Sequence, residues 1–215
     1  MKIRDKNGKW LDSSVFREEA LKFLKTKTYC IDPKGTPAWR EYWTEQLRRT
    51  KEGYEVGGQK ITGHHYFYLN FTQIEIVEKI EGSKATKKTT SQPDFWDGDY
   101  DFFWCLEIAL NGLFNPDSQV PSTEKERSDY TELQKKIAVF TREYGKGYEE
   151  APEYIALKEK RDKISQKVLD RLQLKVKPHL DWVDGGHHFI VGKARRKGYS
   201  YKNGSICTNI YNSVR

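Results

Sequence analysis

One stretch near the C-terminus decides the expected fold: His187-His188-Phe189-Ile190-Val191-Gly192-Lys193-Ala194-Arg195-Arg196-Lys197-Gly198-Tyr199-Ser200-Tyr201-Lys202-Asn203-Gly204. A short apolar segment leads into a basic loop with glycines, and a hydroxyl residue then begins a helix. Such a loop favours anions, because free backbone N–H groups and the positive end of the helix dipole meet there. The stretch therefore predicts a strand, a phosphate-binding loop and the first helix of an α/β nucleotide-binding core.

The loop keeps the physical parts of a P-loop but not its usual spacing. The standard pattern is G-x-x-x-x-G-K-[ST], whereas Gly192 and Gly198 lie six positions apart and Tyr199 stands in the place of the lysine. The lysine lies instead at the front of the loop, as Lys193. A basic surface turn is the alternative interpretation, because runs of charge are usually solvated. The predicted phosphate-binding residues are Gly192, Lys193, Ala194, Arg195, Arg196, Lys197, Gly198, Tyr199 and Ser200.

Three of these residues have chemically distinct expected roles. In nucleotide hydrolysis, positioned cations neutralise phosphate charge and a hydroxyl group holds the magnesium ion. Lys193 and Arg196 are the candidate cations, and Ser200 is the candidate hydroxyl beside the metal. The expected ligands are therefore a nucleotide and Mg²⁺. Ser200 is not a candidate nucleophile, because it lies outside a G-x-S-x-G pattern.

Composition limits the class of protein. The chain has 215 residues, a net charge of +7 and 13% aromatic residues, which excludes a disordered chain and allows a sizeable core. The positive charge suits a polyanionic partner, although solubility alone is an equally good explanation. Three cysteines without C-x-x-C spacing indicate neither disulfides nor a zinc site and predict a reducing, intracellular setting. No apolar leader or run of about 20 apolar residues is present, which predicts a soluble protein.

The N-terminal half is predicted to mix helices and strands. Helices are expected after Asp12-Ser13 and from Pro37 to Gly53. A hairpin should turn at Gly57-Gly58. Strands are expected over 65–71 and 72–80, a polar loop over 82–92, and an apolar helix over 102–110 that ends at Asn111-Gly112.

Two clusters in this half carry alternative interpretations. His64 and His65 are adjacent, so in a strand they would point to opposite faces and not share a metal. Four acids, at positions 94, 97, 99 and 101, match a two-metal carboxylate site, but capping of the following helix explains them better. Cys105 within that helix is predicted to be inert core.

Residues 123–174 predict a charged helical hairpin. The first helix is expected to run from Ser122 or Thr123 to about Tyr144, and the second to follow Ala151-Pro152 and end at about Leu174. Apolar side chains form one stripe on each helix, which should pack on each other or on the body of the protein. The stripes are Leu133, Ile137 and Phe140, and Ile155, Ile164, Val168 and Leu172.

Three segments together resemble the large terminase subunits of tailed bacteriophages. They are 193–204, with its Gly198-Tyr199-Ser200 and a lysine at the front of the loop, and the upstream segments 63–71 and 95–103. The resemblance covers most of residues 39–112 and 183–211. It implies a P-loop NTPase of RecA/ASCE type, with Lys193 in the role of the P-loop lysine, Arg196 as a second cation and Ser200 beside Mg²⁺.

The resemblance also implies a biological role. Terminase large subunits hydrolyse ATP to package double-stranded DNA into procapsids, with a portal protein and a small terminase subunit as partners, in the cytoplasm of the bacterial host. In this family an aromatic residue followed by glutamine recognises adenine. Tyr100 is one candidate for that position, although Asp101 follows it, and Gln73 is another.

The chain departs from this family at its end. It stops at Arg215, inside the helix after the loop, so the second acidic motif and the nuclease domain have no place in it. We therefore expect an N-terminal fragment that hydrolyses ATP poorly or not at all. Its expected parts are a helical region (1–53), a β-rich segment with an apolar helix (54–112), the charged hairpin as an insertion (113–180), and an incomplete nucleotide-binding core (181–215). The alternatives are a non-enzymatic nucleic-acid-binding module and a protein-interaction fragment that docks through 123–174.

Overall fold

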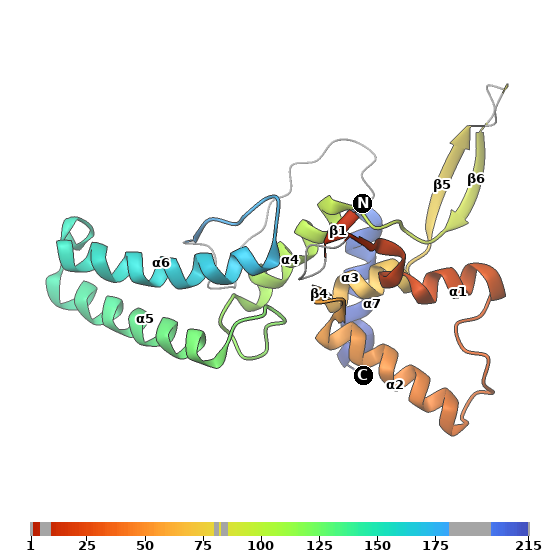
Figure 1. The fold of residues 1–215 in the computed structure, drawn as a ribbon, viewed down its shortest axis with the longest axis horizontal. Coiled ribbons are helices and arrows are strands. Elements are labelled where there is room, and N and C mark those ends of the chain that lie inside the picture. The colour runs from red at the N-terminus through yellow and green to blue at the C-terminus, as the bar shows by residue number, and fades with distance from the viewer. Residues whose placement is uncertain (1, 5–9, 80–81, 83–85, 181–198, 215) are drawn as a thin grey trace. The chain divides into compact units, whose positions relative to one another are not determined.

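The computed structural model describes residues 2–4, 10–79, 82, 86–180 and 199–214 (Figure 1). The chain divides into two compact units, Met1–Phe103 with Gly192–Arg215, and Trp104–Val191. The boundary falls inside one helix, α4 (Asp97–Asn111). This helix confirms the apolar helix that the sequence predicts before Asn111-Gly112. Gly112, with φ 73°, follows its last residue.

Small antiparallel sheets and helices make up the first unit. Its three sheets each have two strands: β1 (Lys2–Arg4) with β2 (Trp10–Asp12), β3 (Tyr54–Val56) with β4 (Gln59–Ile61), and β5 (Ile74–Lys79) with β6 (Thr86–Ser91). Every strand pair in the described ranges is antiparallel. The expected α/β class is thus confirmed only as a mixture of helices and small sheets. The strand expected before the loop at 192–198 lies outside the described residues.

Capping and turn residues in the sequence predict the positions of several of these elements correctly. The Thr36 hydroxyl accepts a hydrogen bond from the Trp39 backbone N–H at 3.3 Å and caps α2 (Pro37–Glu52). The hairpin of β3 and β4 turns at Gly57 and Gly58, both with positive φ, as predicted. The helix expected after Asp12 is split into a short 3-10 turn, η1 (Ser13–Phe16), and α1 (Glu18–Thr26).

The strand predicted over 65–71 is wrong, because Gly63–Phe71 forms helix α3. Thr62 caps this helix, since its hydroxyl accepts a hydrogen bond from the His65 backbone N–H at 3.2 Å. Neighbours bury α3 on several sides, so its apolar residues show no one-sided helical period. Its aromatic side chains also favour strands by propensity alone. His64 and His65 therefore lie in a helix, and the prediction that they point to opposite faces of a strand is also wrong.

The loop predicted over 82–92 is also partly wrong, because Thr86–Ser91 pairs with β5 as strand β6. The register runs from Ile74 opposite Ser91 to Lys79 opposite Thr86. The side chains of β6 are exposed except at its last residue, where Ser91 is half-buried. A strand without a buried face carries no alternation of apolar and polar residues, which is the signal that sequence analysis reads.

Helix α3 lies at the centre of the first unit. Its Tyr66 and Leu69 are buried, and Phe16 and Phe95 pack near it with ring centroids 5.6 Å apart. The Asn70 side chain donates hydrogen bonds to the Phe16 carbonyl at 2.9 Å and the Tyr66 carbonyl at 3.0 Å, which ties η1 to α3.

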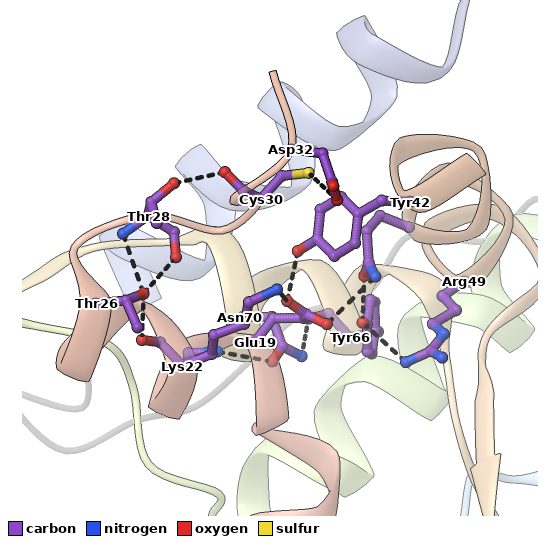
Figure 2. Close-up of polar contacts among 12 residues, drawn as sticks. Glu19, Lys22, Thr26, Thr28, Cys30, Asp32, Tyr42, Arg49, Tyr66 and Asn70 are labelled. Carbon is purple, nitrogen blue, oxygen red and sulfur yellow. Dashed lines mark hydrogen bonds and ion pairs between the residues drawn. The ribbon is translucent and has the colours of Figure 1, made fainter. Parts of the chain in front are cut away.

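A polar network joins α1, α2 and α3 beside this core (Figure 2). The Glu19 carboxylate accepts hydrogen bonds from the Tyr42 hydroxyl and, at 3.4 Å, from the Gln46 amide. The Tyr66 hydroxyl donates to Gln46 Oε1 at 2.6 Å, and Arg49 lies on its other side at 3.4 Å. Burial and the Glu19 carboxylate raise the pKa of Tyr42, so its hydroxyl remains a hydrogen-bond donor at neutral pH.

The second unit contains the helical hairpin, as predicted. Helix α5 (Glu124–Tyr144) and helix α6 (Pro152–Leu172) lie side by side, with a short turn η2 (Tyr148–Glu150) between them (Figure 1). Ile137, Val168 and Leu172 from the predicted stripes are buried. Ile155 from the second stripe is instead 44% exposed.

A capping box fixes the start of α5 and also joins the two helices. The Thr123 hydroxyl accepts from the Glu126 backbone N–H at 3.2 Å, and the Glu126 carboxylate accepts from the Thr123 N–H at 3.0 Å. Arg171 of α6 donates to the same carboxylate at 2.5 and 2.7 Å. Arg171 and the Thr123 N–H hold the pKa of Glu126 far below its usual range. One carboxylate therefore serves as helix cap and as the ion-pair partner that closes the hairpin.

Candidate functional site

The loop expected to bind phosphate lies mostly outside the described residues. Gly192, Lys193, Ala194, Arg195, Arg196, Lys197 and Gly198 all fall in this part of the chain. The described chain resumes with helix α7 (Tyr199–Val214), which begins immediately after Gly198. The helix predicted after this segment is therefore confirmed, and Ser200 lies within it. Ser200 is exposed.

Helix α7 turns a polar stripe, rather than an apolar one, toward the first unit. Lys202, Ser205 and Asn209 are spaced by three and four residues, and each is at most 4% exposed. The apolar side chains Tyr201, Ile210 and Tyr211 are instead 40–56% exposed. Buried polar groups are stable only when they are paired, so the contacts of this stripe determine how α7 is held.

The first of these contacts is a buried ion pair between Lys202 and Asp99. The Lys202 ammonium bonds the Asp99 carboxylate, and the two side chains are 4% and 7% exposed. Asp99 lies in the first turn of α4, and Lys202 lies in the first turn of α7. The Lys202 ammonium also lies 5.6 Å from the centre of the Phe102 ring. Asp99 therefore does more than oppose the dipole of its own helix: it fixes the start of α7.

Two further contacts hold the rest of α7. Ser205 Oγ lies 2.8 Å from Thr72 Oγ1, at the C-terminal end of α3. The Asn209 amide lies 3.0 Å from His64 Nδ1 and 3.4 Å from the Thr50 carbonyl of α2. The helix after the loop is thus bonded to α2, α3 and α4 at three points along its length. Its N-terminal amides consequently have a fixed position in the first unit.

The two adenine candidates both lie in segments that contact α7, but in different environments. Tyr100 follows Asp99, is 5% exposed, and its hydroxyl accepts a hydrogen bond from Gln59 Nε2 at 2.5 Å. Gln73 is exposed and lies in the sequence between Thr72 and Glu75. The backbone N–H of Glu75 donates a hydrogen bond to the Tyr201 hydroxyl of α7 at 3.3 Å. A ligand can reach Gln73 directly, whereas the Tyr100 ring is part of the core.

His65 is buried next to the ion pair and is neutral. Its ring stacks on Phe103 at 4.8 Å and lies 4.9 Å from Phe95. Among the described residues, neither ring nitrogen has a hydrogen-bond partner. Burial, and then the charge of Lys202, lower the pKa of His65 to about 3. At neutral pH it is therefore an aromatic core residue with no charge to offer a ligand.

Within the residues that the structure describes, no group of three His, Cys, Asp or Glu side chains is arranged to hold a metal ion. None of the described helices is long and apolar enough to cross a membrane.

The acids at 94, 97, 99 and 101 separate into different roles. Asp94 pairs with Arg17 at 2.5 Å, and Asp97 and Asp99 lie in the first turn of α4. Asp94, before α4, and Asp99, in its first turn, are thus each paired with a basic side chain.

Comparisons of the chain with protein families, with curated proteins and with solved structures find no match. The function is therefore inferred from the residues of the chain, from the contacts of α7, and from the resemblance of three of its segments to phage terminases.

Proposed function

We propose that residues 192–200 bind the phosphates of ATP with Mg²⁺, and that the chain belongs to the ATPase region of a phage terminase large subunit. One observation carries the proposal: in the sequence a basic segment between Gly192 and Gly198 directly precedes a long helix, α7, whose first turn is held by a buried ion pair. A sequence of this composition ahead of a helix is typical of a polyphosphate cradle.

The first turn of α7 fits the needs of an anion. The first backbone N–H groups of a helix have no partner inside it, and the dipole adds about half a positive charge there. Ser200 is exposed in this turn, so its hydroxyl is accessible to a hydrated metal ion. Bound Mg²⁺ supplies charge neutralisation to the β- and γ-phosphates. Lys193 and Arg196 would add the side-chain cations.

The anchoring of α7 supports this role, because phosphate recognition by backbone amides requires a rigid helix terminus. Lys202 lies two residues after Ser200, and its positive charge is balanced by the negative charge of Asp99. It fixes the helix terminus and leaves the loop cations as the groups that neutralise the phosphates. Gln73 is exposed close to the same helix and is the better placed of the two adenine candidates.

Double-stranded DNA is the proposed partner of the whole motor, with a portal protein and a small terminase subunit as further partners. The segments 63–71, 95–103 and 193–204 support this by resemblance, and the net charge of +7 agrees with a polyanionic partner.

Titration of the chain with ATP·Mg²⁺ by calorimetry tests the proposal. Lys193→Ala with Arg196→Ala should weaken binding by at least about tenfold, because charge-assisted hydrogen bonds contribute about 1.5–3 kcal/mol each. The control is Lys34→Ala with Arg40→Ala, which removes the same charge from exposed positions and should leave the affinity unchanged. Equal affinities of the loop variant and the wild-type chain would refute nucleotide binding at this loop.

A further inference from the structure

We propose that an open groove between α5 and α6 binds the phosphate backbone of duplex DNA. The groove has a volume of about 430 Å³ and lies within the second unit. Four cations line it, Lys125, Lys163, Lys167 and Arg171, together with the acids Glu126 and Asp129. The cations come from both helices, so an extended ligand in the groove is contacted from two sides.

The charge of Glu126 is offset by the cations that pair with it, so its repulsion of an anion in the groove is weakened. Its side chain is 10% exposed and accepts bonds from both terminal nitrogens of Arg171 and from the Thr123 N–H. Arg171 donates in addition to the Pro121 carbonyl at 2.9 Å, so its guanidinium holds structure together. Glu126 and Arg171 cancel each other inside the hairpin.

The lysines are the groups that face solvent. Lys167 is 69% exposed and lies 3.3 Å from Glu126, an outer contact that water screens. Lys125 and Lys163 are exposed and have no ion pair with any residue that the structure describes. Once the Glu126–Arg171 pair is set aside, three lysines face a single acid, Asp129. The side chains that line the groove therefore carry an excess of positive charge.

The spacing and polarity of the groove favour a phosphodiester chain as its ligand. Lys163 and Lys167 are four residues apart on one face of α6, about 6 Å along the helix axis. Each DNA strand carries one charge per about 3.4 Å of duplex axis, so the two lysines reach separate phosphates. Ile164 is the single apolar residue among those that line the groove. A docked peptide would instead require apolar anchor pockets.

The choice of duplex DNA as the ligand rests on the proposed packaging function. The arrangement of the lysines is an observation that is independent of that function. The test is binding of a fluorescent duplex without nucleotide, between about 50 and 200 mM salt. Lys125→Gln, Lys163→Gln and Lys167→Gln together should weaken binding by about tenfold or more. They should also reduce the slope of log affinity against log salt by about 2.7, since each lost phosphate contact contributes about 0.9. Arg171 is retained in this variant, so Glu126 keeps its partner.

The matched control is Lys135→Gln, Lys136→Gln and Lys146→Gln, which removes three charges from exposed positions of the same hairpin that do not line the groove. It should leave the affinity within about twofold. Equal losses in the two triple variants would show that only net charge matters, and no loss in the groove variant would show that DNA does not bind there. Competition by polyglutamate as strong as by DNA would overturn the choice of ligand. A chain that binds DNA through the groove but not ATP·Mg²⁺ would refute only the nucleotide site.

Discussion

Replacing Lys202 with methionine is expected to lower the free energy of unfolding by about 3–5 kcal/mol. The substitution removes the ammonium group that pairs with Asp99, whose side chain is 7% exposed, and leaves a carboxylate without this cation in a nearly dry site. An unpaired buried charge costs much more than the intact ion pair gains. Urea unfolding followed by tryptophan fluorescence measures the loss.

A double variant separates the ion pair from packing. Asp99→Asn with Lys202→Met removes both charges and should recover more than half of the loss, because no uncompensated charge remains. A loss below about 1 kcal/mol for Lys202→Met alone would mean that the pair is solvated and does not anchor α7.

Replacing Gly63 with alanine is expected to destabilise the first unit by about 3 kcal/mol, at the upper end of overpacking effects. A Cβ atom at Gly63 would lie 2.0 Å from the Thr50 carbonyl oxygen and 2.5 Å from its carbon. Both are backbone atoms near the end of α2, so no side-chain rotation relieves the clash. Helices α2 and α3 would have to separate at the point where Asn209 also contacts the Thr50 carbonyl. Thermal and urea unfolding both report this loss.

Gly204 provides the matched control. A Cβ atom at Gly204, in the middle of α7, meets nothing within 4 Å, so Gly204→Ala should stabilise the helix by about 0.5–1 kcal/mol. Opposite signs for the two substitutions are therefore expected. If Gly63→Ala were as well tolerated as Gly204→Ala, α2 and α3 would not approach each other as closely as the structure shows.

Elements whose ends are fixed by local chemistry are predictable from the sequence. Pro37 and Gly53 delimit α2, the Gly57-Gly58 pair turns the β3–β4 hairpin, and Thr123 with Glu126 begins α5. In each case the residue satisfies a backbone requirement that does not depend on the rest of the fold. The charged hairpin is predictable for the same reason, because both of its helices carry their own start signals.

Prediction fails where tertiary packing decides the local structure. Helix α3 is enclosed by α1, α2 and α7, so its side chains are apolar or aromatic on several faces and suggest a strand. Strand β6 has an exposed, lysine- and threonine-rich surface and suggests a loop. Periodicity detects an element only when one face is buried and the other is not.

The groups that hold the candidate site are not predictable in the same way. In the sequence, Asp99 looks like part of a helix cap, and Lys202 like one more cation beside a basic loop. The two residues are 103 positions apart, and nothing in a single sequence indicates that they pair. The one available signal is the spacing of Lys202, Ser205 and Asn209, three polar residues on one face of a helix.

The most direct test of the nucleotide site is hydrogen–deuterium exchange of the wild-type chain with and without ATP·Mg²⁺. Bound phosphates accept hydrogen bonds from the first amides of α7, and such bonds slow exchange. We expect protection in peptides that cover residues 192–202, with little change in peptides from α5 and α6. Unchanged exchange at the start of α7 under saturating ATP·Mg²⁺, or protection confined to another segment, would contradict the proposal that this loop and helix bind the nucleotide.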